Sequence, residues 1–313
     1  MPRVEAEMTI GSGSHVYEVV DGWGNLPDGL SFGTTHGVVE DSHGRIYIHH
    51  TNSPSVFVFD ADGNFIDAWG ETYAEHAHGM HLARESDGEF LYLSATRHHF
   101  VAKTTLTGDE VFRIGTPDLP AIYDKTRLFV PTETTVAPNG DIYITDGYGE
   151  HWVHQYRPDA SYIRSFGGPG SEPGQINNPH GIEIDLRHDE PRLTVADRRN
   201  SRLQYFSLDG DHIGFLDHDL RLPCTAKYHD GETYVPDLHS RLTIFDSNDD
   251  LITHLGDWPR CWERDDWPNL PRSEWTSGKY SSPHDMHVDG SGNIYLVEWL
   301  PEIGGKVTKL LRQ

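Results

Sequence analysis

Pro179-His180-Gly181-Ile182-Glu183-Ile184-Asp185 opens a unit of four short segments, and the other three lie at residues 192–197, 202–206 and 209–215. In each segment apolar and polar side chains alternate, which is the period of a β-strand with one buried face. Gly, Asp, Asn or Pro lies between the segments, and these residues favour tight turns. The unit therefore predicts four antiparallel strands in a meander.

The same unit recurs along the whole chain. Segments that match residues 179–185 lie at 35–39, 77–81, 131–136, 223–227 and 283–288. A four-stranded sheet cannot bury both faces alone, but six such sheets arranged around an axis cover one another. We therefore predict an all-β fold, a six-bladed β-propeller of the NHL type that forms a single domain over residues 1–313.

Two segments fall outside the repeat. Residues 15–20 have a strand pattern but no unit of their own, so we expect them to complete the last blade and close the ring. The insert at about residues 257–282 fits no strand pattern and is too long for a simple connection, so we expect a lid or wall on one face. Its tryptophans either form an aromatic wall for a ligand or pack the insert itself; they are Trp258, Trp262, Trp267 and Trp275.

Composition and charge narrow the class of protein. The chain has 313 residues, 36% of them hydrophobic, and a formal net charge of −24. A polyanion is repelled by nucleic acid and by anionic membranes, so we expect neither as a partner. Residues 1–7 have no apolar core of a secretory signal, and no apolar run reaches the roughly 18 residues of a membrane span. Two distant cysteines argue against a disulfide scaffold and a cysteine-type zinc site. We expect a cytoplasmic protein.

Four of the six repeats carry histidine at one position: His36, His78, His180 and His284. The first strand of each blade lines the channel of a propeller, so residues at the same step of the repeat converge at one height. Three converging neutral imidazoles with an open position describe a catalytic zinc-type site. The alternative stays open that the repeat reuses histidine at strand starts, in a chain with 21 histidines.

Longer stretches carry a resemblance to a known family. Residues 131–148, 174–181, 196–204 and 283–285 resemble the peptidyl-α-hydroxyglycine α-amidating lyase domain, and the resemblance extends from about residue 33 to 310. It implies a six-bladed propeller that splits a hydroxyglycine hemiaminal into an amide and glyoxylate. It also implies zinc, or another divalent transition metal, on His78, His180 and His284.

The resemblance assigns further residues. It implies a catalytic Tyr148, an active-site Arg198, and a calcium ion on the Asp285 carboxylate with carbonyl oxygens near Val38 and Met80. Each has an alternative: a surface turn for Tyr148, a salt bridge to acids for Arg198, and orientation of His284 for Asp285. The chain departs from the family at His50, where the family has arginine, and at the additional His36. We expect both histidines to contact substrate.

The chemistry follows from these groups. A dication on imidazoles acidifies bound water or acts as a Lewis acid, a nearby tyrosine becomes a usable base, and an arginine binds a carboxylate or an oxyanion. The sequence therefore predicts a metal-dependent lyase with a small hydroxylated substrate. Two alternatives remain: a metal-dependent hydrolase such as a lactonase, and a non-catalytic NHL scaffold that binds protein or RNA.

Overall fold

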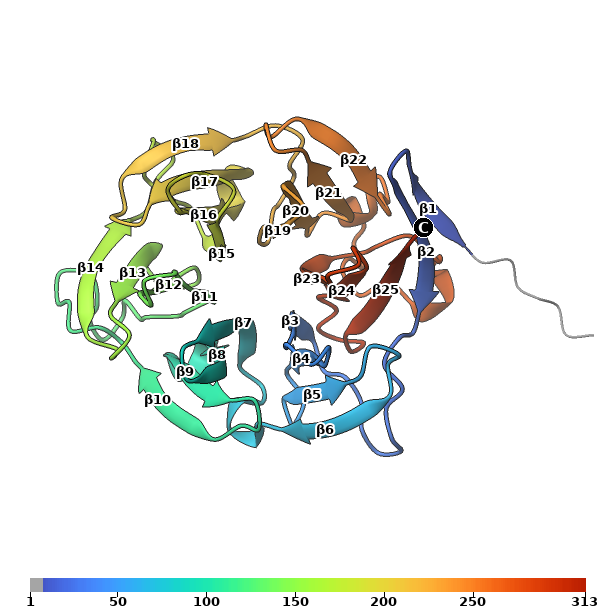
Figure 1. Ribbon diagram of the computed structural model, residues 1–313, viewed down its shortest axis with the longest axis horizontal. Helices are drawn as coiled ribbons and strands as arrows, with labels where there is room; N and C mark the ends of the chain where they lie inside the picture. Colours follow the sequence, from blue (N-terminus) through green and yellow to red (C-terminus); the bar gives the residue numbers. More distant parts are fainter. Residues whose placement is uncertain (1–7) are drawn as a thin grey trace, which may run out of the picture.

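The computed structural model describes residues 8–313, which form six antiparallel sheets around a central channel (Figure 1). Blade 1 contains β3 (Thr35–Glu40), β4 (Ile46–His50), β5 (Val56–Phe59) and β6 (Phe65–Trp69). Blade 2 contains β7 (Ala77–Glu85), β8 (Gly88–Ala95), β9 (Phe100–Thr105) and β10 (Glu110–Ile114). Blade 3 contains β11 (Glu133–Val136), β12 (Ile142–Thr145), β13 (Trp152–Tyr156) and β14 (Tyr162–Gly167).

The remaining blades follow the same order. Blade 4 contains β15 (Pro179–Asp185), β16 (Arg192–Asp197), β17 (Arg202–Ser207) and β18 (His212–Leu216). Blade 5 contains β19 (Lys227–His229), β20 (Glu232–Asp237), β21 (Arg241–Phe245) and β22 (Leu251–Leu255). Blade 6 contains β23 (Pro283–Val288), β24 (Ile294–Glu298) and β25 (Lys306–Arg312), joined by β1 (Thr9–Ser12) and β2 (His15–Asp21). The prediction of an all-β, six-bladed propeller is confirmed.

The N-terminal strand closes the ring. Strand β2 pairs antiparallel with β25, with Tyr17 opposite Arg312 and Asp21 opposite Thr308. This confirms the expectation for residues 15–20. Strand β1 adds a fifth, outermost strand to blade 6, which the repeat did not predict because no other blade has an equivalent.

Hydrophobic clusters lie between neighbouring blades, one at each of the six junctions of residues 8–313. At the junction of blades 1 and 2, for example, Tyr47 and Val58 pack with Met80 and Leu91. Because each blade buries its faces against two others, stability and the position of the inner strands depend on the whole ring. The inner strands β3, β7, β11, β15, β19 and β23 surround the channel (Figure 1).

Blade 5 departs from the predicted repeat. The sequence predicts its inner strand over residues 223–227, but β19 begins at Lys227. Pairing of Lys227 with Tyr234 places Pro236 opposite this earlier segment, and proline has no N–H to donate to a neighbouring strand. The earlier segment keeps an isolated bridge between Pro223 and Asp237 and a hydrogen bond from the Cys224 amide to the Pro236 carbonyl oxygen at 3.0 Å.

In four blades, an acidic residue at the end of the second strand accepts hydrogen bonds from the loop that leads into the first strand of the same blade. Asp197 is fully buried, and its carboxylate accepts hydrogen bonds from the Asn177 amide at 2.7 Å, from Arg202 Nε at 2.6 Å and from Gln204 Nε2 at 2.8 Å. The same position binds entering backbone amides in three other blades; its residues there are Asp146, Asp237 and Glu298. Asp197 therefore holds the start of β15, the strand that carries His180.

We expect Asp197→Ala to lower the free energy of unfolding by about 3–5 kcal/mol, because it leaves the Arg202 cation and a buried amide without their partner. Chemical denaturation followed by tryptophan fluorescence measures this difference. The matched control is Asp209→Ala, whose carboxylate is 73% exposed beside Arg164 and should change stability by less than about 1 kcal/mol. Equal effects of the two substitutions would contradict the anchoring role.

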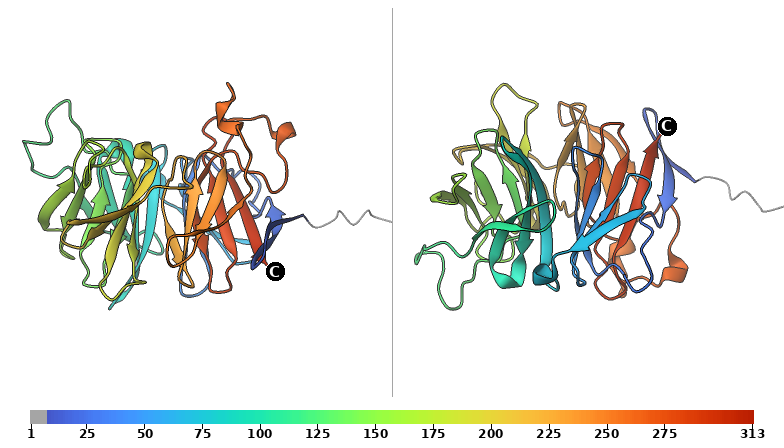
Figure 2. Two further views of the ribbon diagram at one scale, coloured as in Figure 1. Left: turned by 90° about the horizontal axis from the view of Figure 1, so that it is seen from above. Right: turned by 60° about the horizontal axis from the view of Figure 1, so that its bottom comes forward.

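The insert contains two short 3-10 helices, η4 (Cys261–Glu263) and η5 (Arg272–Glu274), and stands out from one face of the ring (Figure 2). Three further 3-10 helices are η1 (Glu71–Tyr73), η2 (Thr96–His98) and η3 (Arg198–Asn200). The indoles of Trp267 and Trp275 donate to the carbonyls of Ser281 and Leu270, so they pack the insert. Trp262 instead stacks on His239, which follows β20, with ring centroids 5.4 Å apart.

Over residues 8–313 no helix combines the length and apolar character needed to cross a membrane. The expectation about a secretory signal in residues 1–7 lies outside the described residues. Both cysteines, Cys224 and Cys261, are buried and unpaired.

Candidate metal centre and active site

Irregular strand pairing at the start of four inner strands sets the direction of the four histidine side chains. In blades 1, 2, 4 and 6 the ladder between first and second strand shifts register at the histidine position, and such a bulge redirects a side chain. In three of these blades glycine follows the histidine, because the next blade lies close. A Cβ on Gly79 would lie 2.4 Å from the Thr132 carbonyl oxygen, and one on Gly181 would lie 2.5 Å from that of Cys224.

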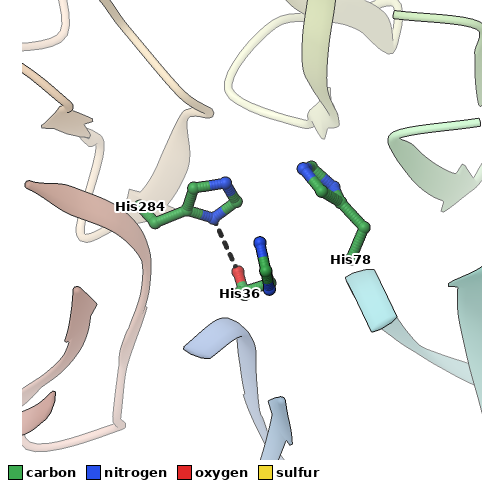
Figure 3. Close-up of side chains that lie close together, drawn as sticks. All are labelled: His36, His78 and His284. Carbon is green, nitrogen blue, oxygen red and sulfur yellow. Dashed lines mark hydrogen bonds between the residues drawn. The ribbon is translucent and has the colours of Figure 1, made fainter. Parts of the chain in front are cut away.

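The structure brings the predicted ligands together on the axis. Ring centroids are 4.8 Å apart for His78 and His180, 4.7 Å for His180 and His284, and 5.0 Å for His78 and His284. The His36 ring lies 4.8 Å from both His78 and His284 (Figure 3). One ligand nitrogen from each of His36, His78 and His284 lies within 4.8 Å of the others.

Backbone carbonyls fix the rings of three histidines. Nδ1 lies 2.7 Å from the Thr132 oxygen in His78, 2.9 Å from the Cys224 oxygen in His180, and 2.9 Å from the His36 oxygen in His284. Because a carbonyl only accepts, each Nδ1 carries the hydrogen and each Nε2 keeps its lone pair. Blades 2, 4 and 6 thus supply the lone pairs, and blades 3, 5 and 1 supply the oxygens that orient them.

These imidazoles are neutral at pH 7. All are buried, and burial lowers the pKa of His78 and His180 well below 6.5 and that of His284 to about 3. Neighbouring imidazoles and Arg198 lower the pKa of His78 and His180 further. Neutral imidazole is the form that binds a metal ion.

The Tyr148 hydroxyl contacts two histidines of the cluster. Its hydroxyl oxygen is 3.0 Å from Nε2 of His78 and 3.1 Å from Nε2 of His180. A hydroxyl has one hydrogen, so it can donate to only one of these two lone pairs. The other contact joins two electron-rich atoms, and a bound cation would relieve it. The donor set of neutral nitrogens fits zinc or another divalent transition metal.

Arg198, the first residue of η3, lies beside Tyr148. Its Nε donates to Asn178 Oδ1 at 2.8 Å, and its Nη2 lies 3.4 Å from the Tyr148 hydroxyl. Within residues 8–313 no ion pair joins Arg198 to an acid, so its charge is available to an anionic group. Desolvation raises the pKa of Tyr148, whereas the Arg198 charge lowers it. The Tyr148 side chain is 42% exposed, which leaves room for a ligand.

His36 and Cys224 also lie at the cluster. His36, expected at the substrate, is only 8% exposed, and its Nδ1 has no hydrogen-bond partner. Cys224 was not predicted, yet its Sγ lies within 4.8 Å of ligand nitrogens of His180 and His284. Burial raises the pKa of this thiol to about 12. The signal was present in the sequence, because Cys224 occupies the repeat position of the histidines.

The structure does not place His50 at the cluster. The side chain is fully buried, and its ring lies 4.1 Å from that of Phe57 and 5.6 Å from that of Phe32. Its Nδ1 accepts the amides of Gly33 and Asn52, both at 3.2 Å. The expectation that His50 contacts substrate is therefore corrected: the ring packs inside blade 1, since the end of a strand fixes a position but not the direction of a side chain.

Asp285 also differs from expectation. Its Oδ2 accepts the Val38 amide at 3.0 Å, and its Oδ1 lies 3.7 Å from Lys227 Nζ. It does not orient His284, whose Nδ1 is bonded to the His36 carbonyl. Calcium takes six to eight oxygen ligands, whereas an N–H group and an ammonium face this carboxylate. The residues around Asp285 therefore do not fit the calcium that the resemblance implies.

Fold and site together define a six-bladed β-propeller with four histidines clustered between its inner strands. The chain is similar to NHL repeat-containing protein 3 of Homo sapiens, at 32% identity over 210 residues, which cover 64% of this chain and 59% of that protein. It thus spans less than two thirds of the length of this relative. No family model matches the sequence.

Two further comparisons concern lyases. A protein of Caenorhabditis elegans named as a probable peptidyl-alpha-hydroxyglycine alpha-amidating lyase is 24% identical over 174 residues, covering 55% of this chain and 47% of that protein. A streptogramin B lyase structure superposes with a TM-score of 0.64 at 14% identity, covering 99% of this chain and all of that one, which shows the fold alone. The resemblance to NHL propellers and amidating lyases is confirmed.

Proposed function

We propose that this protein is a metal-dependent lyase that cleaves a carbon–nitrogen or carbon–oxygen bond next to a hydroxyl group in a small substrate. The observation that carries the proposal is the convergence of the His78, His180 and His284 imidazoles, with Nδ1 bonded to a carbonyl in each, beneath the Tyr148 hydroxyl. Similarity to the amidating lyases supports it.

The residues present fit zinc, or another divalent transition metal, held by His78, His180 and His284. Such an ion supplies Lewis acidity, which favours negative charge on a substrate oxygen. The chain's own groups supply the rest. Arg198 binds a carboxylate or a developing oxyanion of the substrate, and the carbonyl bonds at Nδ1 hold the three rings in position before substrate arrives.

Tyr148 moves the proton in this proposal. Cleavage of a hemiaminal removes a proton from its hydroxyl, forms the carbonyl double bond, breaks the carbon–nitrogen bond and returns a proton to the leaving nitrogen. The Tyr148 oxygen lies between the His78 and His180 nitrogens and Arg198 Nη2, where nearby positive charge stabilises the phenolate that accepts the proton. An exposed edge lets it reach a substrate hydroxyl.

Metal content and activity test the proposal together. We expect close to one zinc-like ion per chain by elemental analysis, turnover of a peptide that ends in hydroxyglycine, and loss of turnover after dialysis against a chelator, restored by zinc. A lactone panel tests the hydrolase alternative. Folded protein that neither contains nor takes up a transition metal would contradict the metal site, and turnover of lactones alone would contradict the lyase.

The proposal takes a small molecule, rather than nucleic acid or a membrane, as the ligand, in keeping with the net charge of −24. The cytoplasmic location stays a prediction. Fractionation of cells that express the full natural protein would test it.

A further inference from the structure

A second set of charged side chains lies in the channel beyond the histidines. Consecutive inner strands each contribute one residue: Glu133 from β11, Glu183 from β15, Lys227 from β19 and Asp285 from β23. A cavity of about 520 Å³ opens beside them, and its lining includes Glu183 and Lys227 but none of the four clustered histidines. Glu183 and Lys227 therefore border a cavity that is separate from the histidine cluster.

Lys227 is the cation of this set. Its Nζ lies 3.2 Å from Glu183 Oε2 and 3.7 Å from Asp285 Oδ1. Glu133 is 6% exposed and Asp285 2% exposed, so neither carboxylate is well solvated. Buried carboxylates require a compensating positive charge, and the ammonium of Lys227 supplies it from within the chain.

A glycine on the neighbouring inner strand leaves room for the Glu133 carboxylate, because a Cβ on Gly79 would lie 2.5 Å from Glu133 Oε1. Gly37 holds the same repeat position in blade 1. Glu133 and Asp285 occupy the repeat position that holds these glycines in blades 1 and 2. Asp285, Glu183 and Glu133 thus place three negative charges around the Lys227 ammonium.

Asp285 Oδ1 depends on the Lys227 ammonium for its compensating charge. The atom is buried and has no hydrogen-bond partner, although it is directed toward Lys227 at 3.7 Å. The other oxygen of Asp285 is bonded to the Val38 amide at 3.0 Å. A calcium ion would need carboxylate and carbonyl oxygens at about 2.3–2.6 Å, and the ammonium would repel it from the same oxygens.

We propose that the Lys227 ammonium is a built-in axial cation, which neutralises Glu183 and Asp285 where the resemblance would place calcium. The ring is therefore stable without calcium, and the histidine cluster forms independently of it. Without Lys227, we expect the same carboxylates to bind calcium.

Lys227→Met tests both statements, because methionine keeps the length of the side chain and removes its charge. After dialysis against calcium and gel filtration, we expect no bound calcium in the parent protein and close to one ion per chain in the variant. Without calcium the melting temperature of the variant should fall by about 5–10 °C, since buried carboxylates lose their partner, and millimolar calcium should restore most of it. Lys125→Met, at an exposed lysine, should match the parent protein in all three measurements.

Each part of the proposal has a result that would overturn it. A parent protein that holds one calcium ion, or that melts at a higher temperature in calcium, overturns the proposal. A folded Lys227→Met variant that ignores calcium overturns the statement about the carboxylates. If the variant does not fold, calcium content and the calcium dependence of melting in the parent protein decide the matter. Zinc content and turnover do not enter these readouts, so the proposal stands or fails apart from the proposed function.

Discussion

Replacing His180 by alanine is expected to remove the bound metal and to lower kcat/KM by at least about 10³-fold. The substitution takes away one of three converging nitrogens and also the contact at 3.1 Å that holds the Tyr148 hydroxyl. Loss of groups that only orient metal ligands costs about 10–100-fold, so loss of a ligand should cost more. Elemental analysis and steady-state kinetics on the same preparation measure both effects.

A matched control shows whether the loss belongs to the site. His218 is an exposed histidine beside Asp219, and we expect His218→Ala to keep both metal and activity. Melting temperatures of the two variants, each freed of metal, show whether His180→Ala is folded. A folded His180→Ala protein with full metal content and full kcat/KM would refute the assignment of His180 as a ligand.

Tyr148→Phe is the second large effect. The substitution removes one oxygen and keeps the ring, so the metal should remain while kcat falls by about 10²–10⁴-fold, the range for loss of a general acid–base group. The expected signature is this separation: metal content near that of the parent protein, with kcat lowered far more than KM is raised.

Tyr162→Phe is the matched control, because Tyr162 is also partly exposed, at 38%, but lies on the outer strand β14. We expect it to leave kcat unchanged. If Tyr148→Phe instead lost the metal and the activity together, the hydroxyl would be part of the metal's coordination rather than the group that moves the proton.

The repeat predicted the blades because the alternation of apolar residues is local and recurs. It could not predict β1, which has no equivalent in the other blades. It also misplaced the start of β19, because the effect of Pro236, which has no N–H, depends on which residue of the neighbouring strand lies opposite. The alternation of apolar residues predicts single strands well, whereas effects of strand pairing can be predicted only when the register between strands is known.

For the site, the phase of the repeat was enough to bring His36, His78, His180 and His284 together. The same phase places Cys224 beside His180 and His284, but a single cysteine is a weak signal in a sequence. The sequence could not predict the direction of a side chain at the end of a strand, and the His50 ring packs against Phe57 in blade 1. The pairing of Lys227 with Glu183 and Asp285 joins three separate strands and is visible only in three dimensions.

The hydrogen bond from His284 to the carbonyl of His36 joins residues 248 positions apart in sequence, across the seam between the last blade and the first. The three imidazoles therefore take up their positions only when the ring has closed through the pairing of β2 with β25. A nascent chain that still lacks its sixth blade presents at most two of the three nitrogens. A metal ion that needs all three nitrogens would therefore bind only after blade 6 has formed beside blade 1.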